Sequence, residues 1–255
     1  MHRITLQEAA ERTGASTHTL GPILVLVHGS GSPGWGTWEA QRPLADRYRL
    51  VLPHRGGYPP NPPLELIDFE VQADEIAELL EPGTHLVGHS YGGVVSLLAA
   101  ARVPDRVASL TVVEPPAFGV ARGNPAVESL IERLTPIFGE PHEPRAFLIA
   151  FLSAVGSNMV PPDPLPPPME ASVRASMVER PPWEAEVPFG TLVAAGFPVL
   201  VVSGAHNAAF DAVCDVLEER LGAERAVIPG AGHSVQRTGE PFNHRLEAFI
   251  RAAAD

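Results

Sequence analysis

The stretch LVGHSYGGVV, Leu86–Val95, decides the fold of this chain. The apolar run Thr84–Gly88 is typical of a short buried strand, and Tyr91–Arg102 is rich in the Ala, Leu and Val residues of a helix. Ser90 therefore lies on the turn between them, in the pattern Gly-x-Ser-x-Gly. The two glycines allow a sharp, strained corner that lifts the serine hydroxyl above a sheet edge, next to a helix N-terminus. The pattern alone also occurs by chance, so its surroundings decide what it means.

Apolar runs on either side of this stretch predict further strands of the same sheet. They are Pro22–Gly29, Tyr48–Pro53, Arg106–Glu114, Pro198–Gly204 and Glu224–Gly230. Helical patterns follow three of these runs, at Asp68–Leu80, Ala208–Leu221 and Pro241–Ala253. Alternating strands and helices specify a parallel sheet that helices cover on both faces. The predicted fold class is therefore α/β with a mostly parallel sheet.

One long segment, Pro115–Gly190, interrupts this alternation. It is apolar and proline-rich, with helical patches at Ala126–Leu134 and Pro144–Leu152 but no series of strands. Because it lies between two predicted strands, we expect residues 115–190 to form an inserted helical cap over the site. Residues 1–114 and 191–255 then form the core. A disordered linker is the alternative, which the many Ile, Leu and Phe residues disfavour.

A serine hydroxyl needs a base to remove its proton before it can attack. Of the ten histidines, His233 combines a loop position with flanking glycine, between the last predicted strand and the last helix. In a parallel sheet, that loop emerges at the same edge as Ser90. We therefore predict His233 as the base; a surface-loop histidine without a role is the alternative.

Acyl transfer also needs backbone N–H groups that stabilise the negative oxygen of the tetrahedral intermediate. The glycine-rich loop Val27–Trp38 follows a predicted strand directly and is suited to turn such an N–H inward. A phosphate-binding loop is disfavoured because no Gly-Lys-Ser/Thr sequence follows, and no dinucleotide glycine pattern opens a helix there.

Three motifs in this order resemble those of the α/β-hydrolase superfamily. Gly88–Gly92 resembles its nucleophile elbow, His28–Gly31 its oxyanion loop and Gly230–His233 its base loop. The resemblance covers nearly the whole chain and implies an α/β-hydrolase fold with an inserted cap.

The resemblance also implies roles for individual residues. Ser90 is the implied nucleophile and His233 the implied base, while the N–H groups of Ser30 and Tyr91 form the implied oxyanion hole. Trp38 is expected to anchor the oxyanion loop in the core.

The position of the triad acid departs from the family pattern. The usual Gly-x-x-Asp sequence reads Gly204-Ala205-His206-Asn207 here, and asparagine cannot supply the charge that stabilises an imidazolium. In an alternative arrangement of the family the acid follows the preceding sheet strand, where this chain has Glu114. We predict Glu114 as the acid, with its carboxylate about 2.6–3.2 Å from His233. Asp211 is the rival, although its surroundings favour a helix.

The apolar cap indicates a substrate with a sizeable apolar part. The predicted pocket residues are Trp35, Phe118 and Trp183, with Phe138, Phe147 and Phe151 as further possibilities. The predicted function is a serine hydrolase that cleaves a carboxylic ester or lactone of an apolar small molecule through an acyl-enzyme. The alternatives are a C–C bond hydrolase of the β-diketone type or a thioester hydrolase on the same triad, and a non-catalytic small-ligand receptor.

Composition limits the partners and the compartment. The net charge of −12 disfavours nucleic acid and anionic membranes as partners, which leaves a small-molecule substrate and an unknown oligomeric state. A single cysteine, Cys214, and the absence of an apolar signal core near the N-terminus lead us to expect a cytoplasmic protein. Neither a metal nor another cofactor is predicted, since the sequence H-E-x-x-H is absent.

Overall fold

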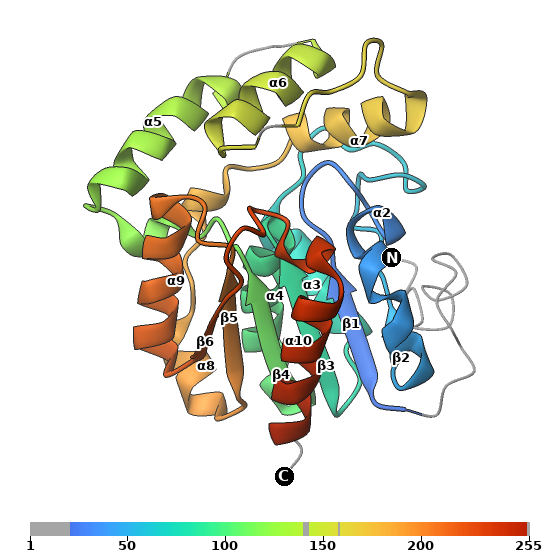
Figure 1. Cartoon of the computed structure of the whole chain (residues 1–255), viewed down its shortest axis with the longest axis vertical. Coiled ribbons are helices and arrows are strands. Elements are labelled where there is room, and N and C mark those ends of the chain that lie inside the picture. The colour runs from blue at the N-terminus through green and yellow to red at the C-terminus, as the bar shows by residue number, and fades with distance from the viewer. Residues whose placement is uncertain (1–20, 140–142, 158, 254–255) are drawn as a thin grey trace.

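A computed structural model describes residues 21–139, 143–157 and 159–253, so the N-terminal stretch considered above lies outside the described residues. One six-stranded sheet forms the centre of the molecule, in the order β2-β1-β3-β4-β5-β6, and all of its strand pairs are parallel (Figure 1). The strands are β1 (Ile23–Val27), β2 (Arg49–Val51), β3 (Thr84–His89), β4 (Val107–Val113), β5 (Val199–Ser203) and β6 (Glu224–Val227). Each lies within one of the predicted runs or within one residue of it, which confirms the predicted fold class.

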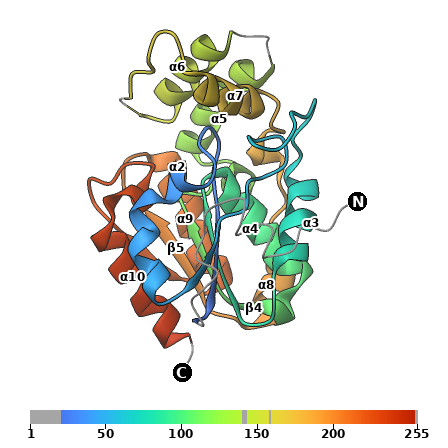
Figure 2. The ribbon, with the colours of Figure 1, turned by 90° about the vertical axis from the view of Figure 1, so that its right-hand side faces the viewer.

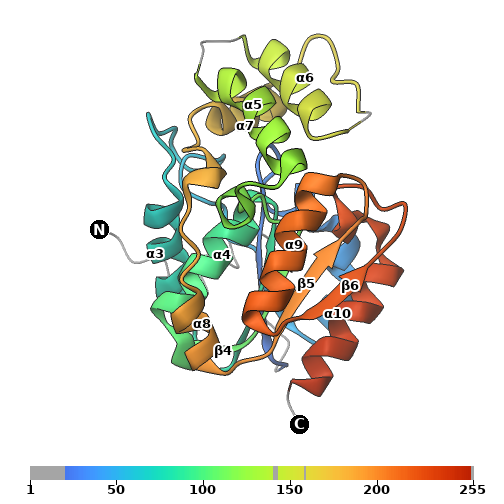
Figure 3. The same cartoon turned by 90° about the vertical axis from the view of Figure 1, so that its left-hand side faces the viewer.

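Helices cover both faces of the sheet. Figures 2 and 3 show α3 (Phe69–Leu79), α4 (Tyr91–Arg102) and α8 (Phe189–Ala195) on one side, and α10 (Glu240–Ala252) on the other. Side chains of α9 (Ala208–Leu221) join the core cluster of α3 and α4. The short helices α2 (Trp35–Trp38) and η1 (Glu39–Asp46) lie on the side of α10.

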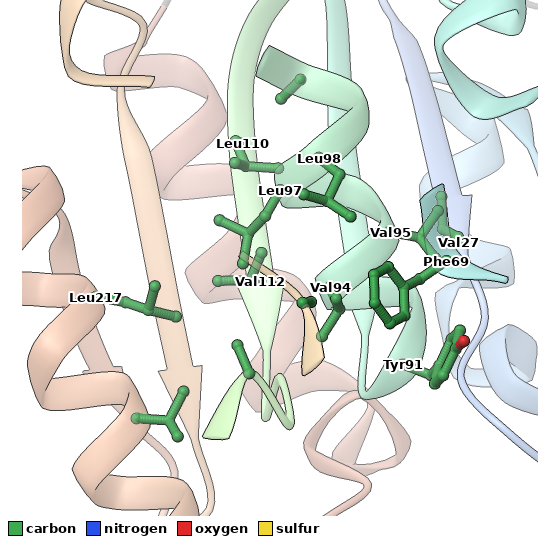
Figure 4. Close-up of a cluster of buried hydrophobic side chains, with 14 of the residues drawn as sticks. Val27, Phe69, Tyr91, Val94, Val95, Leu97, Leu98, Leu110, Val112 and Leu217 are labelled. Carbon is green, nitrogen blue, oxygen red and sulfur yellow. The ribbon is translucent and has the colours of Figure 1, made fainter. Parts of the chain in front are cut away.

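The central helix α4 follows Ser90 directly and is apolar all round. Its residues from Tyr91 to Ala100 are all buried, and Val94, Val95, Leu97 and Leu98 pack among strand and helix side chains in Figure 4. A helix without a polar face is stable only when it is enclosed on all sides. This enclosure fixes the turn that carries Ser90.

Three helices lie above the carboxyl ends of the strands in all three views: α5 (Pro125–Gly139), α6 (Pro144–Ala154) and α7 (Pro167–Met177) (Figures 1–3). The 3-10 turns η3 (Phe118–Ala121) and η4 (Pro182–Glu184) connect them to the sheet. The described part of the predicted insertion, residues 115–190, is therefore mainly helical up to the start of α8 at Phe189, and we call residues 115–190 the cap.

Three α-helices of the described chain were not predicted: the one-turn α2, α7 and α8. The sequence before and within α7 is proline-rich, which argues against a helix, but Pro167 and Pro168 occupy its first turn. Proline costs little there, because the N–H groups of the first turn have no partner within the helix.

Candidate active site

Ser90 sits at the corner between β3 and α4 with a backbone φ of 52°, in the left-handed region that non-glycine residues rarely adopt. Its N–H donates to the carbonyl of Val113 at 2.9 Å, which ties the corner to β4. A Cβ on Gly88 would collide with the backbone of Gly92, and one on Gly92 with the backbone of His28. Both glycines are therefore required for the strained turn.

His233 lies beside this corner, in the loop after β6. Its Nε2 is 3.0 Å from Oγ of Ser90, within hydrogen-bond distance. The ring of Phe210 packs on the imidazole with centroids 4.8 Å apart. His89 supports the loop, since its Nε2–H donates to the carbonyl of His233 at 3.1 Å. Burial, followed by the proximity of His233, lowers the pKa of His89 to about 3, so His89 is neutral.

Glu114 directly follows β4, is fully buried and has a backbone φ of 49°. Its Oε1 accepts from the N–H of Gly204 at 2.7 Å, and its Oε2 is 3.5 Å from Nδ1 of His233. The structure thus brings Glu114 to the predicted base, but at a distance longer than the predicted 2.6–3.2 Å.

A second imidazole lies against the same carboxylate oxygen. Nδ1 of His206 also lies 3.5 Å from Oε2 of Glu114. Sequence reasoning missed His206, although it stands beside the position where the family usually has its acid. Asn207 has a different use: its side chain caps α9 by accepting the N–H of Ala209 at 3.0 Å.

The rival acid, Asp211, is engaged elsewhere. It lies on α9, where its Oδ1 is 3.3 Å from Nη2 of Arg225. Its side chain is one-third exposed, whereas that of Glu114 is fully buried. Among the described residues, the carboxylate in contact with His233 is therefore that of Glu114.

The Glu114 carboxylate is held in its ionised form. Burial alone would raise its pKa, but the imidazoles of His206 and His233 beside the carboxylate, together with the N–H of Gly204, outweigh burial and lower the pKa to about 2. Burial alone would lower the pKa of the His206 imidazole, but the neighbouring Glu114 carboxylate outweighs burial and raises it. Glu114, His206 and His233 place one possible ligand atom each within 4.8 Å of one another. Among the described residues, this is the group that could also hold a metal ion.

The lowered pKa predicts a pH dependence of stability. A carboxyl with a pKa near 2 when folded and 4.5 when unfolded stabilises the folded state above pH 4.5 and loses this contribution as the pH falls toward 2. Between pH 5 and pH 3, the wild-type free energy of unfolding should fall by about 2 kcal/mol more than that of Glu114→Gln. Urea unfolding of both proteins at the two pH values measures the difference. Equal falls would show that Glu114 has an ordinary pKa.

A cavity opens between this group and the cap. It contains about 360 Å³ of space not filled by atoms, part of it open to solvent. Ser90 and His233 line it together with the predicted oxyanion residues, Ser30 and Tyr91. The remaining lining is apolar: Pro116, Phe118, Leu134, Phe138, Phe151, Val155, Pro182, Trp183 and Phe210. The predicted pocket residues Phe118 and Trp183 are thus both in contact with the cavity.

Two aromatic residues lie elsewhere. The prediction for Trp35 is wrong, because its ring lies under the guanidinium of Arg42 at 4.1 Å and packs on the α10 side of the sheet. Phe147 is buried among cap side chains. Trp38 is fully buried on the α10 side, as expected of a loop anchor.

Comparisons with known proteins concern the family and the fold of the chain. The sequence pattern of the family described as "Alpha/beta hydrolase family" matches residues 24–245. A pimeloyl-[acyl-carrier protein] methyl ester esterase from Methylococcus capsulatus is 37% identical over 112 residues, which are 43% of this chain and 44% of that protein. The aligned segment therefore spans less than half of the length of this relative.

Solved structures share the fold over most of the chain. The esterase RhEst1 from Rhodococcus sp. ECU1013 is 20% identical, with a TM-score of 0.66, over 94% of each chain. NosK from Streptomyces actuosus is 25% identical with a TM-score of 0.62, over 92% of this chain and 100% of that one. At such identities the structural likeness concerns the fold.

Proposed function

This chain belongs to the alpha/beta hydrolase family, and we propose that it is a serine hydrolase that cleaves a carboxylic ester or lactone of an apolar small molecule through an acyl-enzyme. The observation that carries the proposal is the chain of contacts from Ser90 to His233 to Glu114, which ends at an apolar cavity. A nucleophile within hydrogen-bond distance of a base that a third group orients is the arrangement of covalent acyl transfer.

In the proposed reaction, Oγ of Ser90 attacks the carbonyl carbon while Nε2 of His233 takes its proton. The ionised Glu114 stabilises the imidazolium that forms and holds it in the required orientation. The N–H groups of Ser30 and Tyr91 stabilise the negative oxygen of the intermediate. His233 then protonates the leaving alcohol, and a water molecule hydrolyses the acyl-enzyme by the same steps in reverse.

The cavity supports the proposed substrate class. Its lining from Pro116 to Phe210 is made of apolar and aromatic side chains, and none of the described residues in it is Lys, Arg, Asp or Glu. Transfer of an apolar acyl or alcohol group from water into this cavity is favourable, whereas a charged group there would have no partner of opposite charge. The relative whose name is a methyl ester esterase supports an ester as the cleaved bond.

A panel of substrates tests the proposal against its alternatives. Purified protein and Ser90→Ala are assayed with p-nitrophenyl esters, lactones, thioesters and β-diketones. The proposal expects Ser90-dependent turnover of esters or lactones. Preferred turnover of thioesters or β-diketones would instead identify a thioester hydrolase or a C–C bond hydrolase. No turnover of any substrate class would favour a binding protein.

Trp183 is expected to limit the length of the acyl group. Its indole lines the cavity and packs perpendicular to Phe138, with ring centroids 5.5 Å apart. Trp183→Ala should therefore raise the ratio of kcat/KM for p-nitrophenyl octanoate over acetate at least about fivefold, since a longer chain gains room to bury its methylene groups. Trp35→Ala is the matched control, since its ring lies away from the cavity, and should leave the ratio unchanged. Equal ratios in all three proteins would show that Trp183 does not limit the acyl site.

A further inference from the structure

We propose that Glu179, a cap residue, is a positioning residue for the oxyanion hole and acts through Arg55 on the peptide between Gly29 and Ser30. The inference rests on the proposed function, because an oxyanion hole has a role only in acyl transfer. It adds a coupling between the docking of the cap and the chemistry at Ser90.

Glu179 carries a fully buried carboxylate two residues after the end of α7. Its Oε1 is 2.7 Å from Nη2 of Arg55, whose side chain is also fully buried. The hydroxyl of Tyr58 donates to the same oxygen at 2.8 Å, and the hydroxyl of Ser30 donates to Oε2 at 2.5 Å. The cap thus reaches the predicted oxyanion loop through a charged group that is cut off from water.

Arg55 connects this carboxylate to the backbone of the loop. Its Nε donates to the carbonyl of His28 at 2.9 Å, and its Nη2 donates to the carbonyl of Gly29 at 2.9 Å. The imidazole of His28 is kept neutral mainly by burial, which holds its pKa well below the usual value. Its Nδ1–H donates to the carbonyl of Gly29 at 2.7 Å, while its Nε2 accepts the backbone N–H of Arg55 at 3.1 Å. Two donors therefore fix the direction of the Gly29 carbonyl.

The direction of that carbonyl determines the direction of the next N–H. The Gly29–Ser30 bond is not among the cis peptide bonds of the described residues, so the N–H of Ser30 points away from the side to which the carbonyl of Gly29 points. The carbonyl faces Arg55, and Ser30 lines the cavity next to Ser90. Within the described chain, the Ser30 N–H donates to no protein acceptor, so it is available to a substrate oxygen.

The peptide between Gly29 and Ser30 lies so close to Ser90 that reversing its orientation would affect the reaction. A Cβ on Gly29 would be 2.8 Å from Cβ of Ser90. If the peptide turned over, the carbonyl oxygen of Gly29 would face the place where the substrate oxygen becomes negative. Repulsion would then replace a hydrogen bond that is typically worth 10²–10³-fold in kcat.

Docking of the cap segment keeps Glu179 in place. The N–H of Ile67 donates to the carbonyl of Val178, and the N–H of Arg180 donates to the carbonyl of Ile67, both at 2.8 Å. This parallel bridge joins the cap segment to the loop before α3. Moving the segment away would leave Arg55 as a buried charge without its partner, a state that proteins avoid. The oxyanion hole is therefore set only when this part of the cap is docked.

Glu179→Gln removes the charge and keeps the shape of the side chain. We expect kcat for p-nitrophenyl butyrate to fall about 100-fold with KM changed less than threefold, because the lost interaction acts in the transition state. Affinity for phenylboronic acid, which forms a tetrahedral adduct with an active serine, should fall by a similar factor. A merely structural role would lower the fraction of folded protein but not the kcat of the folded molecules.

The matched control is Asp68→Asn. Asp68 pairs with Arg180 of the same cap segment at 3.4 Å and caps α3 through its other oxygen, a task that asparagine also performs. This variant weakens a partly exposed ion pair but keeps the backbone bridge at Ile67 and the contacts of Glu179 with Arg55, so its kcat should stay within twofold of wild type.

A second variant decides the matter if Glu179→Gln folds poorly. Replacing the buried pair together, Arg55→Met with Glu179→Leu, leaves no unpaired charge and is expected to fold. It should lose kcat at least as strongly as Glu179→Gln while Ser90 still reacts with a fluorophosphonate. A folded double variant with kcat within threefold of wild type would overturn the inference. Absence of Ser90-dependent ester hydrolysis in the wild-type protein would instead overturn the proposed function.

Discussion

Replacement of Ser90 with alanine is expected to abolish ester hydrolysis, with kcat about 10⁶-fold lower, as in serine hydrolases that lose their nucleophile. The covalent step needs the hydroxyl, and no other group at the corner can replace it. The fold should persist, because the side-chain hydrogen bond of Ser90 in the described structure is the one to His233. Steady-state kinetics with p-nitrophenyl butyrate and thermal unfolding of both proteins measure the two effects.

The companion variant His233→Ala should lose activity to a similar extent. The two changes together should cost little more than either alone, because nucleophile and base act as one unit. If Ser90→Ala lost less than tenfold, or if the two losses multiplied, Ser90 and His233 would not form the proposed pair.

Glu114→Gln is expected to have the next largest effect after these two variants, with kcat about 10²–10⁴-fold lower and KM little changed. The neutral amide cannot stabilise the imidazolium, and its NH₂ group can favour the wrong tautomer of His233. The loss is expected in the chemical step and not in substrate binding. The Glu114 carboxylate faces Nδ1 of His233, whereas Ser90 faces Nε2 on the other side of the ring. Steady-state kinetics at a pH where the fold is stable separates kcat from KM.

The rival carboxylate supplies the control. Asp211→Asn breaks a partly exposed pair with Arg225 and should leave kcat within twofold. Asn207→Asp should not rescue Glu114→Gln, because the side chain of residue 207 caps α9. An active Glu114→Gln protein beside an inactive Asp211→Asn protein would reassign the acid to Asp211.

The sheet and the contact between Ser90 and His233 could be predicted from sequence for a physical reason. Strands of a parallel sheet are buried on both faces and appear as continuous apolar runs, so β1 and β3 to β5 are conspicuous. Parallel strands also bring their following loops to one edge. Two loops with glycine at the right places therefore had to meet.

Other parts of the site have no such signal. Arg55 and Glu179 are 124 residues apart in sequence, in two loops without periodicity, and their pairing depends on how the cap docks. The contact of His206 with Glu114 depends on a strained backbone at Ala205, where φ is 50°. Trp35 was assigned to the wrong side because a glycine-rich loop does not reveal where its side chains point.

The central claim is that Ser90 is a nucleophile activated by His233. Its most direct measurement is the intact mass of the protein after exposure to a fluorophosphonate, followed by peptide mapping of the modified site. The account predicts one adduct per chain, on Ser90, with labelling lost in Ser90→Ala and strongly slowed in His233→Ala. A folded wild-type protein that acquires no adduct, or acquires it on another residue, would contradict the account.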